Sequence, residues 1–205
     1  QGPRMQIIWH YDAVPPEFCG SVVVLGNFDG VHRGHQTVIG QASRAAKETG
    51  VPLVLITFEP HPRRYFRPQD PSFCLTPFRS KKHYLTALGV DLLVVLSFDE
   101  TLSKKPAEVF VQEVLFDSFK ASQVVVGYDF VFGHQRKGNV ALLSAFSCTQ
   151  GVILTVIEPV ATADGGIYSS TGIREYLTAG KPGHAAALLG RPFEIEGCVV
   201  HGDHR

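Results

Sequence analysis

The chain has 205 residues, of which 44% are hydrophobic and 19% are charged. This length and composition fit a globular protein with one domain, or one domain and a fragment, and they exclude a disordered chain and a coiled coil. Lysine and arginine number 19, as do aspartate and glutamate, so the formal net charge is zero. A protein that binds nucleic acid regardless of sequence carries a basic excess, so we expect no nucleic-acid partner.

The apolar runs are about five to seven residues long, as at 51–56 and 90–96, whereas a helix that spans a membrane needs about 20. The cysteines are scattered and form no Cys-x-x-Cys pair, which indicates neither a zinc site nor a disulfide framework. They are Cys19, Cys74, Cys148 and Cys198. We therefore expect a cytoplasmic protein with reduced cysteines, no membrane contact and no metal-ligating set of its own. Nothing in the sequence indicates the oligomeric state.

Five apolar runs alternate with helical patterns along the chain. The runs, each expected to form a strand, lie at 21–26, 52–58, 91–96, 123–127 and 152–157. The helical patterns lie at 34–49, at 76–88, after Pro106, at 140–146 and at 171–179. Uninterrupted apolar strands are typical of sheets buried on both faces. The pattern therefore predicts an α/β, Rossmann-like fold with an open parallel five-stranded sheet and helices on both faces.

Local signals mark the beginnings of two of these helices. Thr76 and Pro77 predict a helix start, with Thr76 as the capping residue and Pro77 at the first helical position. The helix that Pro106 opens should bury one apolar face, formed by Phe110, Val111, Val114 and Leu115. Ligands of such folds bind outside the carboxyl ends of the strands. We therefore expect the site just after residues 26, 58, 127 and 157.

The first strand runs directly into a segment rich in glycine and histidine, and then into a helix. The segment reads Gly26-Asn27-Phe28-Asp29-Gly30-Val31-His32-Arg33-Gly34-His35. Glycines let the backbone approach a ligand closely, and a helix N-terminus offers free N–H groups to an anion. Two histidines flanking a glycine at that point could hold phosphate oxygens and stabilise charge during phosphoryl transfer. The spacing fits neither a Walker A loop nor a GxGxxG fingerprint.

A second polar motif opens the helix predicted at 171–179. Ser169, Ser170 and Thr171 place three hydroxyls at the helix start, where one of them would serve as the N-cap. Arg174 follows on the first turn, where a basic residue opposes the helix dipole. Its presence there indicates a nearby anion.

Two further segments follow strands and contain aromatic or stiff residues. Phe58-Glu59-Pro60-His61-Pro62 is a loop in which two prolines fix the backbone. Phe130 and Phe132 lie two residues apart, so in an extended segment they share one face. Such a face suits a flat aromatic ligand, although it would equally suit a packed core. Asp129, polar among apolar neighbours, is expected to bond a ligand or the loop.

Together these segments resemble a known family. The His-x-Gly-His sequence after the first strand is the signature of the nucleotidylyltransferase superfamily. The run 26–36 looks like the FMN adenylyltransferase module of prokaryotic bifunctional riboflavin kinase/FMN adenylyltransferases, the FAD synthetases. The segments at 57–62, 75–77, 126–133 and 169–174 agree with that module and follow in the same order.

The resemblance implies an enzyme that transfers AMP from ATP to the phosphate of FMN, giving FAD and pyrophosphate, with Mg²⁺ as cofactor. It implies catalytic roles for His32, His35 and Arg174. The implied ATP-binding residues are Gly26, Asn27, Phe28, Asp29, His32, Gly34, His35, Ser170, Thr171 and Arg174. The implied flavin-binding residues are Phe58, Pro60, His61, Pro62, Asp129, Phe130 and Phe132.

The chain departs from the family pattern at three places. Val131 stands where the family usually carries arginine, so that position supplies no charge. Tyr168 replaces the usual isoleucine. The segment 192–205 looks like the entry to a riboflavin kinase barrel, yet the kinase motif Pro-Thr-Ala-Asn is absent. We therefore interpret 1–4 as a tag remnant, 5–190 as the adenylyltransferase domain, and 191–205 as the start of a truncated riboflavin kinase domain whose natural protein continues.

Three alternatives remain at the level of sequence. The same histidine loop would serve a nucleotidylyltransferase with another phosphate acceptor, such as phosphopantetheine or nicotinamide mononucleotide. A non-catalytic flavin or nucleotide carrier would bind the ligand without releasing pyrophosphate. A zinc hydrolase would use His32, His35 and His61 as ligands, and it would also need a general base.

Overall fold

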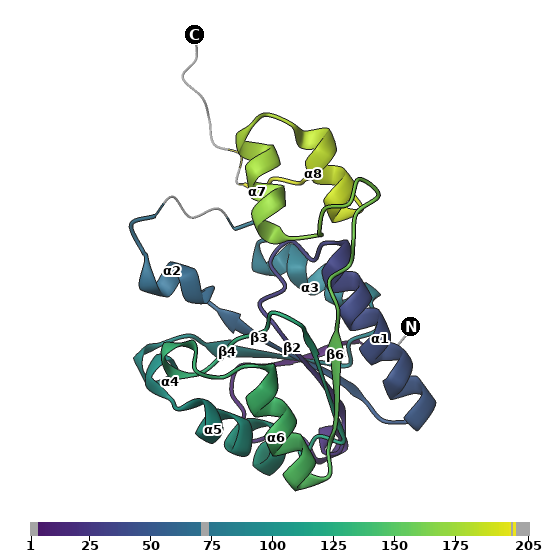
Figure 1. Cartoon of the computed structure of the whole chain (residues 1–205), viewed down its shortest axis with the longest axis vertical. Coiled ribbons are helices and arrows are strands. Elements are labelled where there is room, and N and C mark those ends of the chain that lie inside the picture. The colour runs from purple at the N-terminus through teal and green to yellow at the C-terminus, as the bar shows by residue number, and fades with distance from the viewer. Residues whose placement is uncertain (1–3, 71–73, 198, 200–205) are drawn as a thin grey trace.

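The computed structural model describes residues 4–70, 74–197 and 199 (Figure 1). The strands of this described part form one parallel sheet of six, in the order β1-β4-β3-β2-β5-β6. Their bounds are β1 (Gln6–Ile8), β2 (Val22–Leu25), β3 (Leu53–Glu59), β4 (Leu92–Ser97), β5 (Gln123–Gly127) and β6 (Ile153–Ile157). The expected α/β class with a parallel sheet is confirmed.

The expected number of five strands is wrong, because β1 adds a sixth at the edge of the sheet. β1 pairs in parallel with β4, with Gln6 opposite Leu92. It has three residues and is only partly buried. A strand of that length has no periodicity to detect, so only its pairing with β4 reveals it.

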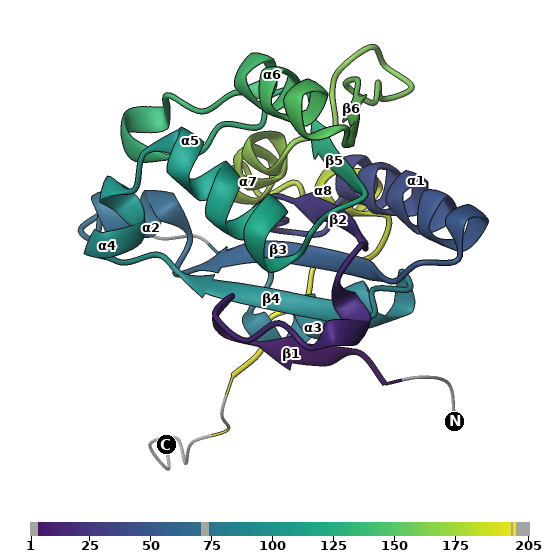
Figure 2. The same cartoon turned by 90° about the horizontal axis from the view of Figure 1, so that it is seen from below.

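Helices cover both faces of the sheet, as expected (Figure 2). One face carries α1 (Arg33–Thr49) and α3 (Phe78–Ala87). The other carries α6 (Val140–Gln150) and α5 (Ala107–Phe110), which continues into a π-helical stretch, η2 (Val111–Ser118). The apolar face predicted for the helix after Pro106 is fully buried there. Side chains of β2 alternate between the two cores, as the pleat of a strand requires.

The predicted cap of the helix at 76–88 is wrong. The helix, α3, begins at Phe78 with Pro77 as its N-cap, and no side chain caps it. Thr76 is buried instead, and its Oγ1 accepts a hydrogen bond of 2.9 Å from the backbone N–H of Gly30. A distant loop therefore uses the hydroxyl that local reasoning assigned to the helix end.

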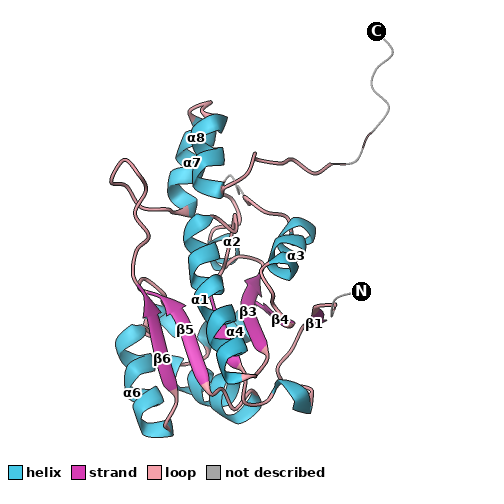
Figure 3. Cartoon of the chain, turned by 90° about the vertical axis from the view of Figure 1, so that its right-hand side faces the viewer, coloured by secondary structure: helices cyan, strands magenta, loops and turns pink. Residues whose placement is uncertain are grey.

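Two helices lie beyond the carboxyl ends of the strands (Figure 3). They are α7 (Ser170–Thr178) and α8 (Pro182–Leu189), and they pack on each other and on Leu75 in a third apolar cluster. The remaining short elements are η1 (Pro16–Phe18), α2 (Pro62–Phe66), α4 (Glu100–Lys104) and η3 (His134–Arg136). Of the segments interpreted as a tag and a truncated kinase domain, residues 1–3, 198 and 200–205 lie outside the described residues.

The order of the strands creates a crevice at one point of the sheet. From β2 the chain moves outward to β3 and then β4, and it returns to place β5 on the opposite side of β2. The connections therefore diverge between the carboxyl ends of β2 and β5, where open α/β sheets bind their ligands. Within the described residues, no helix combines the length and apolar character needed to cross a membrane.

Candidate active site

A polar cavity of about 440 Å³ opens at the carboxyl ends of β2, β5 and β6. Every residue predicted to bind ATP lines it, although the first motif and the second lie far apart in the chain. These residues are Gly26, Asn27, Phe28, Asp29, His32, Gly34, His35, Ser170, Thr171 and Arg174. The fold therefore brings the two predicted polar motifs together around one cavity.

The two histidines occupy the N-terminus of α1. His32 is the N-cap, and its Nδ1 accepts a hydrogen bond of 3.3 Å from the backbone N–H of His35. This bond places the proton of a neutral His32 on Nε2. The rings of His32 and His35 stack with their centroids 3.6 Å apart.

Both rings are neutral at pH 7. Burial lowers the pKa of His32 to about 4, against the opposing pull of Asp29. Burial also holds the pKa of His35 well below its usual range, and the neighbouring His32 and Lys81 add to the effect. Both histidines therefore present neutral imidazole rings, not cations, at the N-terminus of α1, where free backbone N–H groups favour an anion.

Two glycines of this motif leave space for neighbouring rings that a Cβ would contact too closely. A Cβ on Gly34 would lie 3.0 Å from Cε1 of His32, so glycine leaves room for the capping ring. A Cβ on Gly26 would lie 2.9 Å from Cζ of the buried Phe28. The spacing His-x-Gly-His therefore belongs to a loop in which the first histidine folds back over the helix start.

Asp29 joins three separate parts of the site. It is buried, and its Oδ1 accepts hydrogen bonds from the backbone N–H groups of Leu75 (3.0 Å) and Thr76 (3.2 Å). Its Oδ2 pairs with the guanidinium of Arg174. Its backbone carbonyl accepts a bond of 2.7 Å from Ser170 Oγ. The anion that the position of Arg174 predicted is thus present in the protein itself, as the carboxylate of Asp29.

The three hydroxyls of the second motif have different positions. Ser169 is the N-cap of α7, since its Oγ accepts a bond of 3.0 Å from the N–H of Gly172. Ser170 holds the Asp29 carbonyl, and Thr171 lines the cavity with an exposed side chain.

A buried lysine supports the same loop and was missed by sequence reasoning. Lys81, on α3, is 3% exposed. Its Nζ lies 3.0 Å from Glu59 Oε1 and donates a bond of 3.2 Å to the backbone carbonyl of Asn27. A buried lysine needs such partners. Its only sequence signal was a lysine on the apolar side of a predicted helix.

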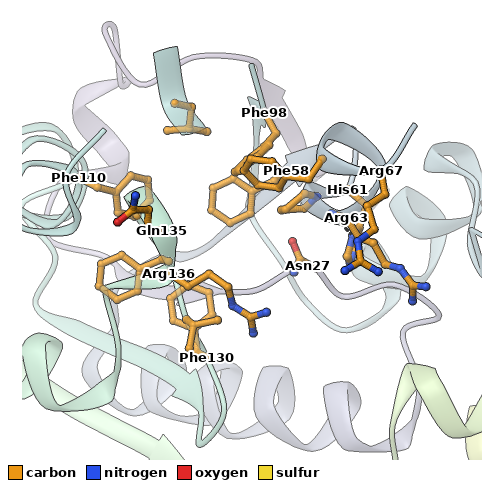
Figure 4. Close-up of a pocket in the computed structure, with 16 residues that line it drawn as sticks. Asn27, Phe58, His61, Arg63, Arg67, Phe98, Phe110, Phe130, Gln135 and Arg136 are labelled. Atoms are coloured by element: carbon orange, nitrogen blue, oxygen red, sulfur yellow. Dashed lines mark hydrogen bonds between the residues drawn. The ribbon is translucent and has the colours of Figure 1, made fainter. Parts of the chain in front are cut away.

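A second cavity of about 690 Å³ adjoins the first, and six phenylalanines lie among its lining residues (Figure 4); we call it the aromatic cavity. Five of the predicted flavin-binding residues line it, namely Phe58, His61, Pro62, Phe130 and Phe132. The other two lie elsewhere: Pro60 lines a smaller neighbouring cavity, and Asp129 lines the polar one. Phe130 and Phe132 share a face, as predicted, with ring centroids 5.4 Å apart.

Sequence reasoning missed a large part of the aromatic cavity. The missed lining residues come from α2 and its C-cap, from the segment after β4 that includes α4, from α5 and from η3. They are Arg63, Phe66, Arg67, Phe98, Leu102, Phe110, Gln135 and Arg136. The short helix α2 was itself not predicted; His61 caps it, with Nδ1 accepting from the N–H of Arg63 at 3.1 Å.

The two cavities share one rim. The shared residues are Asn27, His61, Arg63, Phe130, Val131 and Arg136. Val131 carries no charge, as noted from the sequence, but two arginines lie on the same rim. Asn27 Oδ1 is buried there without a hydrogen-bond partner. The site thus consists of a polar cavity and an aromatic cavity, here also called the polar and aromatic chambers, which meet at a positively charged rim.

Comparison with known proteins supplies the family. The sequence profile described as FAD synthetase matches residues 14–171. This chain belongs to the FAD synthetase family. The resemblance noted from the sequence motifs is thereby confirmed.

Curated relatives of this FAD synthetase-family chain have the same description, bifunctional riboflavin kinase/FMN adenylyltransferase. The relative from Haemophilus influenzae is 38% identical over 90% of this chain and 59% of its own length. The Pseudomonas fluorescens relative is 37% identical over 97% of the chain and 63% of its own length, and the Escherichia coli K12 relative 34% over 96% and 62%. The chain therefore spans about three fifths of the relatives it matches.

Solved structures agree with the fold of the family. A protein from Streptococcus pneumoniae, described as a macrolide-efflux protein, superposes with a TM-score of 0.83 at 30% identity, over 98% of this chain and 64% of that one. A pantoate-beta-alanine ligase from Francisella tularensis gives a TM-score of 0.53 at 14% identity, over 90% and 86%. The second likeness shows a shared fold alone.

Proposed function

We propose that this chain is an FMN adenylyltransferase of the His-x-Gly-His nucleotidylyltransferase type, which converts FMN and ATP to FAD and pyrophosphate. The observation that carries the proposal is the shared rim of the two cavities. An isoalloxazine ring in the aromatic cavity would direct its phosphate toward the rim, and a nucleotide in the polar cavity would present its α-phosphorus there. The family and the relatives' descriptions support this pairing of substrates.

The transfer needs no protein nucleophile. An oxygen of the FMN phosphate forms a bond to the α-phosphorus of ATP, and the bond from that phosphorus to the α,β-bridging oxygen breaks. Pyrophosphate leaves with the electron pair. Catalysis then consists of positioning and electrostatic stabilisation. Arg63 and Arg136 at the rim would hold the two phosphates against their mutual repulsion.

The polar cavity would stabilise the departing phosphates. The Nε2–H of neutral His32 and the ring of His35 would donate to triphosphate oxygens at the start of α1. Arg174, oriented by Asp29, would hold the β and γ phosphates together with Ser170 and Thr171. Neutral donors suit this place, because burial lowers the pKa of both imidazoles and a protonated ring would lose its proton there.

We propose Mg²⁺ as the cation that accompanies ATP. Within residues 4–70, 74–197 and 199, no group of three or more His, Cys, Asp or Glu side chains is placed to hold a metal. Mg²⁺ keeps several waters and binds mainly to substrate phosphates, so it needs few ligands from the protein. The ion would offset phosphate charge. It would leave the histidines and Arg174 as the donors that the protein supplies.

We also propose a cytoplasmic location.

The structure bears to different degrees on the three alternatives to FMN adenylyltransferase: another phosphate acceptor, a zinc hydrolase and a non-catalytic carrier. An aromatic cavity favours a flat ring over the flexible chain of phosphopantetheine. A zinc hydrolase on His32, His35 and His61 would need converging ligand atoms, yet the first two rings are stacked face to face. A carrier would require the same two cavities but no pyrophosphate release, so only an activity measurement separates it from the enzyme.

The decisive experiment incubates the purified chain with FMN, ATP and Mg²⁺ and measures FAD and pyrophosphate. We expect both products in equal amounts, and no FMN from riboflavin and ATP, because the chain lacks the Pro-Thr-Ala-Asn motif. Parallel reactions with nicotinamide mononucleotide and phosphopantetheine test the rival acceptors. Flavin binding without pyrophosphate would establish the carrier, and product from a rival acceptor alone would replace FMN as the substrate.

A further inference from the structure

The segment that follows α8 contacts the histidine loop from outside both cavities. It leaves α8 and runs past α3 (Figure 2). Its first side chain, Arg191, donates hydrogen bonds to the backbone carbonyls of Gly30 (2.7 Å) and Val31 (3.2 Å). The guanidinium carbon also lies 3.7 Å above the ring centroid of Tyr84 on α3. One planar group thus bridges α3 and the loop that precedes α1.

The two carbonyls belong to a strained part of the loop. Gly30 has φ of 91° and Val31 has φ of 42°. Left-handed backbone is rare for a β-branched residue, costs about 1–3 kcal/mol and persists only where the surroundings hold it. Val31 O also accepts a bond of 2.9 Å from Gln36 Nε2, which donates to Leu189 O as well, at 3.0 Å. The end of α8 and Arg191 therefore hold the strained peptides from one side.

The next residue along the chain is His32, the cap of α1. Its ring orientation depends on the direction in which the backbone leaves Val31. We propose that Arg191 is a positioning residue of the enzyme, whose guanidinium fixes the Gly30 and Val31 carbonyls and thereby orients the imidazole of His32 toward the polar cavity. This inference rests on the proposed adenylyltransferase activity.

The chemistry of the contact requires arginine. One side chain donates to two carbonyls and also stacks on an aromatic ring, which the planar guanidinium of arginine with its several N–H donors can do. The ammonium of lysine is a point charge and cannot reproduce both bonds and the stacking. Burial is the main cause of the lowered pKa of His32; the charge of Arg191 acts in the same direction and that of Asp29 opposes it.

A simpler reading is that Arg191 only fastens the 191–197 segment to the domain. That segment has other attachments, which do not touch the loop. Tyr84 Oη donates to Glu194 Oε2 at 2.9 Å, and Ser80 Oγ bonds to Glu196. Glu194→Ala loosens the segment while leaving the Arg191 contacts to Gly30 and Val31, and so it is the matched control.

The test compares Arg191→Ala, Arg191→Lys and Glu194→Ala with the parent chain by steady-state kinetics, thermal melting and amide hydrogen exchange of residues 26–36. Misplacing a donor by about 1 Å costs up to about 100-fold in rate. We expect Arg191→Ala to lower kcat by about 10- to 100-fold at nearly unchanged KM for FMN. Arg191→Lys should recover little of this loss, whereas millimolar guanidinium ion should restore part of the kcat of Arg191→Ala. Exchange should become faster in both Arg191 variants and remain at the parent's rate in Glu194→Ala.

Several results would overturn the proposal: unchanged kcat and exchange in the Arg191 variants, equal losses in Glu194→Ala, or a loss of kcat that only follows the loss of folded protein. If Arg191→Ala does not fold, the same measurements on Arg191→Lys decide. A parent chain that makes no FAD refutes the proposed function instead. Exchange in residues 26–36 then still tests the loop contact, since it needs no activity.

Discussion

The two chambers of the site are built in different ways. The polar cavity is a set of groups that bond to one another: Asp29 holds Arg174, Ser170 holds the carbonyl of Asp29, and Lys81 holds that of Asn27. The aromatic cavity is a set of rings from separate elements that are in contact but share no hydrogen bonds with each other, such as Phe58 with Phe98 and Phe110.

The contrast bears on how each chamber responds to change. Hydrogen-bonded buried groups form a network in which one loss leaves several partners unsatisfied. Apolar contacts are non-directional, so a substituted ring is partly replaced by its neighbours. We therefore expect the polar chamber to fail sharply and the aromatic chamber to lose affinity gradually. The following substitutions test this difference, beginning with the largest effect.

Asp29→Asn should have the largest effect, since it removes the charge that joins Arg174 to the loop. We expect loss of measurable FAD formation and a fall of about 2–4 kcal/mol in the free energy of unfolding, because a partly buried guanidinium loses its counter-ion. Urea unfolding and FAD formation are the measurements. Asp12→Asn, on the exposed surface, is the control and should match the parent. Parent-like activity in Asp29→Asn would contradict the network.

His35→Ala should act on the rate without unfolding the protein. Loss of one donor at a site of changing charge typically costs about 10²–10³-fold in kcat. We expect a fall of that size, with KM for FMN nearly unchanged, because His35 lines only the polar cavity. His10→Ala, an exposed histidine, is the control. Near-normal turnover at saturating ATP would make His35 a structural residue.

His32→Asn should change the pH dependence of stability. The folded state lowers the pKa of His32 to about 4, below its unfolded value near 6.5. Between these values the unfolded chain binds the extra proton, so stability is complete above about pH 6.5 and declines as the pH falls toward 4. Asparagine still caps the helix but does not titrate. The decline between pH 7 and pH 4, followed by urea unfolding, should be about 1–3 kcal/mol smaller in the variant; an identical decline would contradict burial of the ring.

Phe130→Leu should have the smallest effect. The change keeps an apolar side chain but removes a ring from the rim of the aromatic cavity. An aromatic pair contributes about 0.5–1.5 kcal/mol beyond its buried area, so KM for FMN should rise by about 3- to 10-fold, and KM for ATP should rise less although Phe130 also lines the polar cavity. Phe146→Leu, on α6 and stacked on Phe116 away from both cavities, is the control. An equal rise in KM for ATP would contradict the assignment of Phe130 mainly to the flavin.

The local parts of this molecule could be predicted and the long-range parts could not. The histidine motif lies on one strand-to-helix junction and the second polar motif at one helix start, so each group of predicted ATP-binding residues was visible as a contiguous pattern. Thr76 shows the limit: its neighbours predicted a cap, and a loop 46 residues earlier took its hydroxyl. Lys81 and Phe98 joined the site through the packing of α3 and of the segment after β4, which no spacing within those segments reveals. β1 depends likewise on its partner β4.

The contact between Gly30 and Arg191 spans 161 residues of sequence. A chain is made from its N-terminus at roughly 5–20 residues per second, so the loop exists for about 8–30 seconds before its arginine is synthesised. A nascent chain that has reached residue 190 already contains His32, His35 and Arg174, yet it lacks the donor that fixes the loop. On the proposed role of Arg191, this domain then acquires catalytic competence only after the sheet and helices of its described part have been synthesised.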